Sequence, residues 1–172
     1  PVYYADLEAK KLLNQSTEIK RLLIAEFGNN LFKSEELDRA LLANLIFTNK
    51  LALEKVNAIV HPEVAAHFLA WCENQKSAYV LQEAAILFET GGYKRFEKTI
   101  LVTAPKDLRI ERIMKRDGLT REQILSRMNN QWEDEKKIPL ADFVIFNDDE
   151  KMLLPQIKGI HENILRFANS RS

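Results

Sequence analysis

Apolar residues recur at helical spacing through the first part of the chain. They return every three or four positions from Ile19 to Phe27, which predicts an amphipathic helix that ends at Gly28. The same spacing predicts further helices over about residues 6–13, 39–46, 50–60 and 64–72. Pro62 is expected to end one of these helices and to open the next.

The pattern changes near residue 78, where short apolar runs replace the helical period. Runs at 78–81, 98–103 and 142–146 predict buried strands, and residues 1–4 predict an opening strand. Helices are predicted over about 106–116, 121–132 and 150–168. Strands that alternate with helices indicate an α/β fold with a parallel sheet. We therefore expect one domain over residues 1–172, with a helical subdomain inserted at about 15–75.

Composition and charge limit the function. Lys plus Arg number 25 and Asp plus Glu number 25, so no overall basic field favours nucleic acid or an anionic membrane surface. No apolar run is long enough to span a bilayer, and no basic-then-apolar leader opens the chain. Cys72 is the single cysteine, which favours a reducing compartment. We expect a cytoplasmic protein without nucleic-acid or membrane partners.

Two acidic residues follow predicted strands, where ligands of open α/β sheets bind. Asp6 can cap the helix that follows it, or it can accept the proton of an attacking hydroxyl as the base of a kinase, and one residue can do both. Glu83 can hold magnesium through water, or it can pair with a cation at the sheet edge. The sequence leaves these alternatives open.

A row of arginines marks a second candidate site. Arg109, Arg112 and Arg116 share one face of a predicted helix, and Arg127 lies on the next helix. Such a row is either a solvated face or a set of donors for a triphosphate. The chain has no nucleophile elbow, Cys/His nucleophile pair or zinc spacing, so hydrolase and metalloenzyme functions gain no support.

Six segments in order resemble the motifs of the dephospho-CoA kinase family. They are Pro1 to Asp6, Leu37-Asp38-Arg39, Leu53-Glu54 with Ile59, His61-Pro62 and Val64, Ile86-Leu87-Phe88-Glu89 with Gly91, the series Arg112, Arg116-Asp117, Arg127 and Gln131, and Ala141-Asp142 through Asn147. The sequence departs from the family pattern at Tyr4, Glu83, Ala85 and Arg109.

The resemblance implies a P-loop kinase fold, with a helical domain for the CoA-like substrate and a lid at about 106–132 that closes over ATP. The reaction implied is transfer of the γ-phosphoryl group of Mg-ATP to the ribose 3′-hydroxyl of dephospho-CoA. The implied roles are Asp6 as base, Arg39 and His61 on the acceptor side, Arg112, Arg116 and Arg127 at the ATP phosphates, Asn147 near adenine and Glu83 at magnesium.

The family's phosphate-binding loop, Gly-x-x-x-x-Gly-Lys-[Ser/Thr], does not occur in these 172 residues. The resemblance places that loop and the first, central strand ahead of Pro1, so we expect a cut chain that is inactive alone. Another P-loop nucleoside or nucleotide kinase is a neighbouring alternative. A non-catalytic binding module with a degenerate kinase fold is an alternative of a different class.

Overall fold

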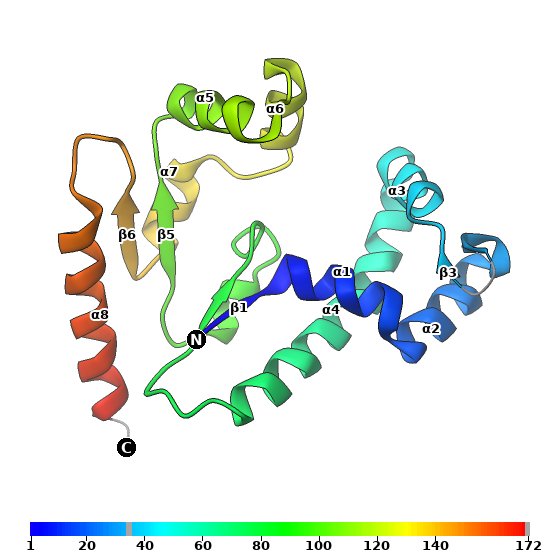
Figure 1. Ribbon diagram of the computed structural model, residues 1–172, viewed down its shortest axis with the longest axis horizontal. Helices are drawn as coiled ribbons and strands as arrows, with labels where there is room; N and C mark the ends of the chain where they lie inside the picture. The colour runs from blue at the N-terminus through cyan, green and yellow to red at the C-terminus, as the bar shows by residue number, and fades with distance from the viewer. Residues whose placement is uncertain (34–35, 171–172) are drawn as a thin grey trace. The chain divides into compact units, whose positions relative to one another are not determined.

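The computed structural model describes residues 1–33 and 36–170. The chain forms two compact units, Pro1–Ala85 and Ile86–Ser172. Each unit contains one pair of parallel strands and its own helices (Figure 1). No helix in the described ranges is both long and apolar enough to cross a membrane.

The first unit pairs two strands that are far apart in the sequence. Strand β1 (Val2–Tyr4) lies parallel to β4 (Leu81–Glu83), with Val2 opposite Leu81 and Tyr4 opposite Glu83. The second strand lies slightly later in the chain than the apolar run at 78–81 predicts. The register aligns the carboxyl ends of β1 and β4, so the residues that follow them share one edge.

The first unit also contains the helices α1 (Ala5–Gln15), α2 (Thr17–Phe27), α3 (Arg39–Thr48) and α4 (Lys50–Glu73). The side chains of Ser16, Asp38 and Asn49 accept backbone N–H bonds at the starts of α2, α3 and α4. Ile19 and Leu23 of α2 are fully buried, as their spacing predicts.

A short antiparallel pair lies between α2 and α3, inside the segment that we predicted to be helical. It consists of β2 (Phe32–Lys33) and β3 (Glu36–Leu37), and a 3-10 turn at Asn29–Leu31 precedes it. Two-residue strands are too short to give an alternating pattern of apolar and polar residues. The sequence therefore contained no signal for this pair.

The expectation that Pro62 ends a helix is wrong, because α4 runs through it. A proline inside a helix costs about 3 kcal/mol. Val56 and Val60 are buried on one side of Pro62, and Val64 packs against the same core on the other side. Burying one such side chain contributes about 1.5–3 kcal/mol, so together they outweigh the cost of the proline.

The second unit is built on β5 (Ile100–Thr103) and β6 (Phe143–Phe146), which pair in parallel with Ile100 opposite Phe143. Its helices are α5 (Lys106–Asp117), α6 (Arg121–Met128), α7 (Asp134–Lys137) and α8 (Leu153–Asn169). Two 3-10 turns, Gly92–Arg95 and Ile138–Leu140, complete the unit. Figure 1 shows α5 continuing from the tip of β5, and α8 beside β6.

Two helix ends in this unit differ from the predicted ranges. Helix α6 ends at Met128 instead of continuing to residue 132, and a turn then leads to the separate helix α7. Helix α8 begins at Leu153 instead of about residue 150. The side chain of Asp148 accepts the backbone N–H groups of Glu150 and Lys151, which forms a turn where the helix was expected.

Candidate active site

The carboxyl edge of β1 and β4 carries the two acidic residues singled out in the sequence. Glu83 is the last residue of β4 and lies opposite Tyr4, while Asp6 stands in the first turn of α1, two residues past β1. Both residues are exposed. The fold therefore brings Asp6 and Glu83 to one edge of one strand pair.

The structure distinguishes the two possible roles of Asp6. Tyr4 occupies the N-cap position of α1, and no side chain caps that helix. Asp6 has no side-chain hydrogen bond or ion pair to any described residue, so the capping role is wrong. Its carboxylate is an unoccupied acceptor at the positive end of a helix, where a negative charge is favoured.

The residues proposed for the acceptor side lie on the helices of the first unit. Asp38 caps α3 through Leu41 and also pairs with Lys33 at 2.5 Å. The hydrogen bond from Lys33 and the backbone N–H of Leu41 hold the pKa of Asp38 below its ordinary value. Arg39 begins α3, is exposed and donates from Nε to Asn14 Oδ1 at 3.2 Å. His61 is exposed on α4.

Arg112 and Asn147 meet at the carboxyl end of β6. The Nη1 group of Arg112 donates to the backbone carbonyl of Asn147 at 2.8 Å, and Nη2 pairs with Asp149 at 2.5 Å. The backbone N–H of Asn147 donates to the carbonyl of Thr103 at 2.8 Å and so extends the pairing of β5 with β6. Arg112 thereby fixes the loop that presents Asn147.

Arg116 and Arg127 both act on one carboxylate. Arg116 makes a two-pronged contact with Asp117, with Nε–Oδ1 at 2.7 Å and Nη2–Oδ2 at 3.0 Å. The hydrogen bonds from Arg116, together with the charges of Arg116 and Arg127, hold the pKa of Asp117 below its ordinary value. The Arg116 side chain is 75% exposed. Arg116 thus binds Asp117 directly on the surface of α5, while Arg127 acts on that carboxylate only through its charge.

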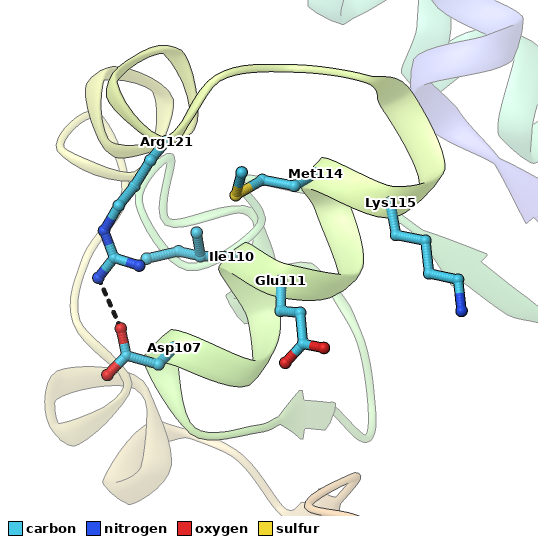
Figure 2. Close-up of a pocket in the computed structure, with 6 residues that line it drawn as sticks. All are labelled: Asp107, Ile110, Glu111, Met114, Lys115 and Arg121. Carbon is cyan, nitrogen blue, oxygen red and sulfur yellow. Dashed lines mark hydrogen bonds and ion pairs between the residues drawn. The ribbon is translucent and has the colours of Figure 1, made fainter.

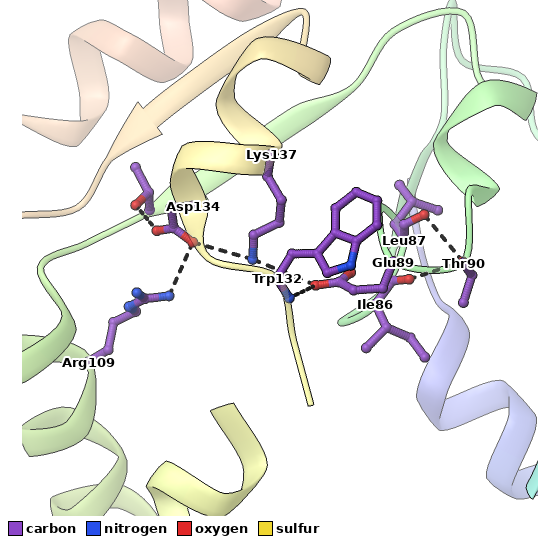
Figure 3. Close-up of polar contacts among 9 residues, drawn as sticks. Ile86, Leu87, Glu89, Thr90, Arg109, Trp132, Asp134 and Lys137 are labelled. Carbon is purple, nitrogen blue, oxygen red and sulfur yellow. Dashed lines mark hydrogen bonds and ion pairs between the residues drawn. The ribbon is translucent and has the colours of Figure 1, made fainter. Parts of the chain in front are cut away.

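A largely buried set of charges lies at the end of β5, and Arg109 is the one member that the sequence placed in a candidate site. We call it the ionic network, and it consists of Glu89, Arg109, Asp134 and Lys137 (Figure 3). Residues 134–137 form a run of charged residues, which in sequence is typical of a solvated face. The spacing of three between Asp134 and Lys137 was the only signal that they share one side of a helix.

A separate groove lies between α5 and α6. Ile110 and Met114 form its apolar part, and an ion pair between Arg121 and Asp107 at 2.7 Å lies at its side (Figure 2). None of the site residues predicted from the sequence lines this groove. We therefore place the candidate chemistry at the strand ends and not in the groove.

The parallel strand pairs, with polar side chains after their carboxyl ends and arginines on the helices beyond β5, define an α/β protein of the P-loop kinase class. A family model described as dephospho-CoA kinase matches residues 1–152. The chain therefore belongs to the dephospho-CoA kinase family, whose members are phosphotransferases with an alcohol acceptor in coenzyme A biosynthesis.

Individual relatives agree with this assignment. The chain is 38% identical over 158 residues to a dephospho-CoA kinase of Bacteroides fragilis, a match that covers 91% of this chain and 77% of the relative. It is 34% identical over 179 residues to a dephospho-CoA kinase of Chlorobium chlorochromatii, with 99% and 84% covered.

Solved structures show the same fold. A crystal structure of a Thermus thermophilus protein superposes with a TM-score of 0.79 at 32% identity, covering 96% of this chain and 83% of that one. The dephospho-CoA kinase of Campylobacter jejuni superposes with a TM-score of 0.61 at 27% identity, covering 99% and 86%.

Proposed function

We propose that this protein transfers the γ-phosphoryl group of ATP to the 3′-hydroxyl of the ribose of dephospho-CoA, with Asp6 as the general base. The observation that carries this proposal is the placement of Asp6. It is an exposed carboxylate with no partner among the described residues, and it lies just past the carboxyl end of a parallel strand. Ligands of open α/β sheets bind at this edge.

The chemistry proposed for Asp6 follows from its position and its lack of a partner. Its side chain neither caps α1 nor pairs with another described residue. It can therefore accept the proton of the ribose 3′-hydroxyl as the oxygen attacks phosphorus, which is the task of the aspartate in related phosphoryl transfers.

We propose that Arg116 and Arg127 bind the phosphates of ATP. Arg116 makes a two-pronged contact with the carboxylate of Asp117, and the charge of Arg127 acts on the same group. The two-pronged geometry of Arg116 also suits a phosphate. We propose Arg112 for the phosphates as well; it also holds the loop of Asn147, which we propose lies near the adenine base. Arg39 and His61 are proposed to face the acceptor from α3 and α4.

The edge of β1 and β4 offers two carboxylates, Asp6 and Glu83, to a magnesium ion. Within residues 1–33 and 36–170, no group of three or more His, Cys, Asp or Glu side chains could hold a metal ion. Mg²⁺ is typically held by one or two carboxylates together with substrate phosphates and water, which matches Glu83 beside Asp6. When bound with ATP, the ion would neutralise charge on the phosphates, and Glu83 would hold it through water.

We further propose that the protein acts in the cytoplasm. Cys72 is a free thiol, and its partial burial raises its pKa. An unpaired cysteine supports a reducing compartment.

The base is tested by replacing Asp6 with Asn in the full-length protein. Loss of general base catalysis should lower kcat by about 10²–10⁴-fold and leave the KM for ATP nearly unchanged. Glu8→Gln is the matched control, since Glu8 is a second acidic residue in the first turn of α1 and pairs only with Lys11 among the described residues. If Asp6→Asn retained the turnover of Glu8→Gln, Asp6 would not be the base.

A further inference from the structure

The ionic network of Glu89, Arg109, Asp134 and Lys137 is largely buried, and its most exposed side chain, Arg109, is 28% exposed. The Lys137 side chain is 9% exposed, and those of Glu89 and Asp134 are each 11% exposed. Buried charges are costly unless they are paired, and a buried ion pair often adds no more stability than apolar side chains of the same volume. Two carboxylates and two cations balance here, so the network is electrically neutral. Its presence calls for a role beyond stability.

The network joins four segments of the second unit. The hydroxyl of Thr103, at the carboxyl end of β5, donates to Asp134 on α7. The other oxygen of Asp134 lies 3.3 Å from Arg109 Nη1 on α5 and 3.3 Å from Lys137 Nζ. Lys137 Nζ lies 3.9 Å from Oε1 of Glu89, in the turn that follows Ile86 (Figure 3). The buried ammonium group of Lys137 thus lies between Asp134, which binds the end of β5, and Glu89 in that turn.

The same Glu89 oxygen holds the chain that leaves α6. It accepts the backbone N–H of Trp132 at 2.9 Å. Between Trp132 and α6, the backbone N–H of Asn130 donates to the carbonyl of Arg127 at 3.2 Å, so the turn is tied back to the last turn of the helix. Lys137 is therefore linked through Glu89 and the backbone N–H of Trp132 to the turn that is tied to the backbone carbonyl of Arg127.

The network leaves some of its polar atoms without partners. Oε2 of Glu89 and Nε of Arg109 are buried and make no hydrogen bond to a described residue. The separation of 3.9 Å between Lys137 and Glu89 is also too long for a direct hydrogen bond. The orientation of the Glu89 carboxylate therefore depends on the charge of Lys137 and on the N–H of Trp132, because little else holds it.

We propose that Lys137 is a positioning residue for phosphoryl transfer. It neutralises Glu89 and Asp134 together, and so keeps the Glu89 carboxylate on the N–H of Trp132 and the end of α6 in place. Arg127 is the group through which it acts. The proposal rests on the proposed function, in which Arg127 binds the phosphates of ATP.

Lys137→Met in the full-length protein tests this role, because it removes the charge and keeps most of the length of the side chain. We expect kcat/KM for ATP to fall about tenfold or more, since small displacements of a phosphate-binding group are costly in phosphoryl transfer. Lys136→Met is the matched control, because Lys136 is the preceding residue of α7 and is exposed. It should keep the kinetics of the wild type, and a Lys137→Met variant that matched it would overturn the proposal.

A double-mutant cycle separates positioning from a purely structural role. If Lys137 acts through Arg127, Lys137→Met should cost little in an Arg127→Ala background, and the double variant should match Arg127→Ala within about twofold. If the fold losses in kcat/KM of the two single variants multiply in the double variant, Lys137 does not act through Arg127. That result would overturn the positioning role and leave the proposed function intact. Wild-type kinetics for Arg127→Ala would instead contradict both proposals.

Glu89→Gln gives an independent test if Lys137→Met does not fold. The amide oxygen of Gln can still accept the N–H of Trp132, but it no longer pairs with the charge of Lys137. We expect a smaller loss in kcat/KM for ATP, about three- to tenfold, that again disappears in the Arg127→Ala background. Unchanged kinetics for Glu89→Gln would count against the proposal.

Discussion

Asp142 belongs to a motif of the family, yet its position indicates a structural role. It precedes β6 at the amino ends of the strands, opposite to the edge where ligands bind. Its carboxylate accepts the backbone N–H of Thr99 at 2.8 Å, the Thr99 hydroxyl at 3.0 Å and Lys98 Nζ at 2.9 Å. We predict that Asp142→Ala lowers stability and leaves the kinetics for ATP unchanged.

The loss of stability in Asp142→Ala follows from the partners of Asp142 that remain without an acceptor. Thr99 is 5% exposed, so its backbone N–H would lose its acceptor inside the protein, at a cost of about 1–3 kcal/mol. The Lys98 and Asp142 side chains are each 34% exposed, and such a pair adds about 0–1 kcal/mol. The sum is about 1–4 kcal/mol, which lowers the melting temperature of a chain of this size by about 2–16 °C.

Thermal unfolding followed by circular dichroism measures this loss. Asp142→Asn should lose less than Asp142→Ala, because its amide oxygen can still accept the N–H of Thr99. Glu150→Gln, an exposed residue in the loop after β6, is the control and should melt as the wild type does. A structural role for Asp142 would be wrong if Asp142→Ala and Glu150→Gln had the same melting temperature. It would also be wrong if Asp142→Ala raised the KM for ATP without changing the melting temperature.

The pH dependence gives a second readout for the same residue. Partial burial works to raise the pKa of Asp142, but the hydrogen bonds from Lys98 and Thr99 outweigh it and hold the pKa below its ordinary value. A lowered pKa stabilises the fold above the pKa of the unfolded chain, and that contribution is lost as the pH falls through the folded value. Asp142→Ala should therefore lose less stability on acidification below about pH 4 than the wild type does.

Two further predictions concern other residues. Burial raises the pKa of Tyr3 to about 12, and its hydroxyl lies 2.8 Å from Nδ1 of His67. The wild type should therefore lose stability between about pH 10 and 12, and Tyr3→Phe should lose less in alkaline unfolding experiments; equal slopes would contradict this. Arg116→Ala should raise the KM for ATP by about tenfold in steady-state assays, because it removes a charged donor to phosphate. An unchanged KM would leave Arg116 as a surface partner of Asp117 alone.

The sequence predicted the elements that have a clear period or a clear cap. The spacing from Ile19 to Phe27 predicted α2, and the helical pattern from residue 121 predicted the start of α6. Both signals depend on residues that are close in sequence, so contacts with distant parts of the chain do not change them. The prediction that Pro62 ends a helix was wrong because the burial of nearby side chains outweighs the cost of a proline inside a helix. The sequence alone does not show how large that burial is.

The candidate site was predictable only in part. The sequence singled out Asp6 and Glu83 because they follow predicted strands, and the pairing of β1 with β4 brings both to one edge. The ionic network was missed because Glu89 lies far in sequence from Asp134 and Lys137. Only the folded chain shows that these charges are buried together.

We infer that this protein phosphorylates the ribose 3′-hydroxyl of dephospho-CoA. The most direct measurement is ³¹P NMR of the product formed from dephospho-CoA and ATP by the full-length protein. We predict a new phosphate monoester at the ribose 3′ position, formed in step with ADP. ADP formation without that monoester, or a phosphate on any other hydroxyl, would contradict the account.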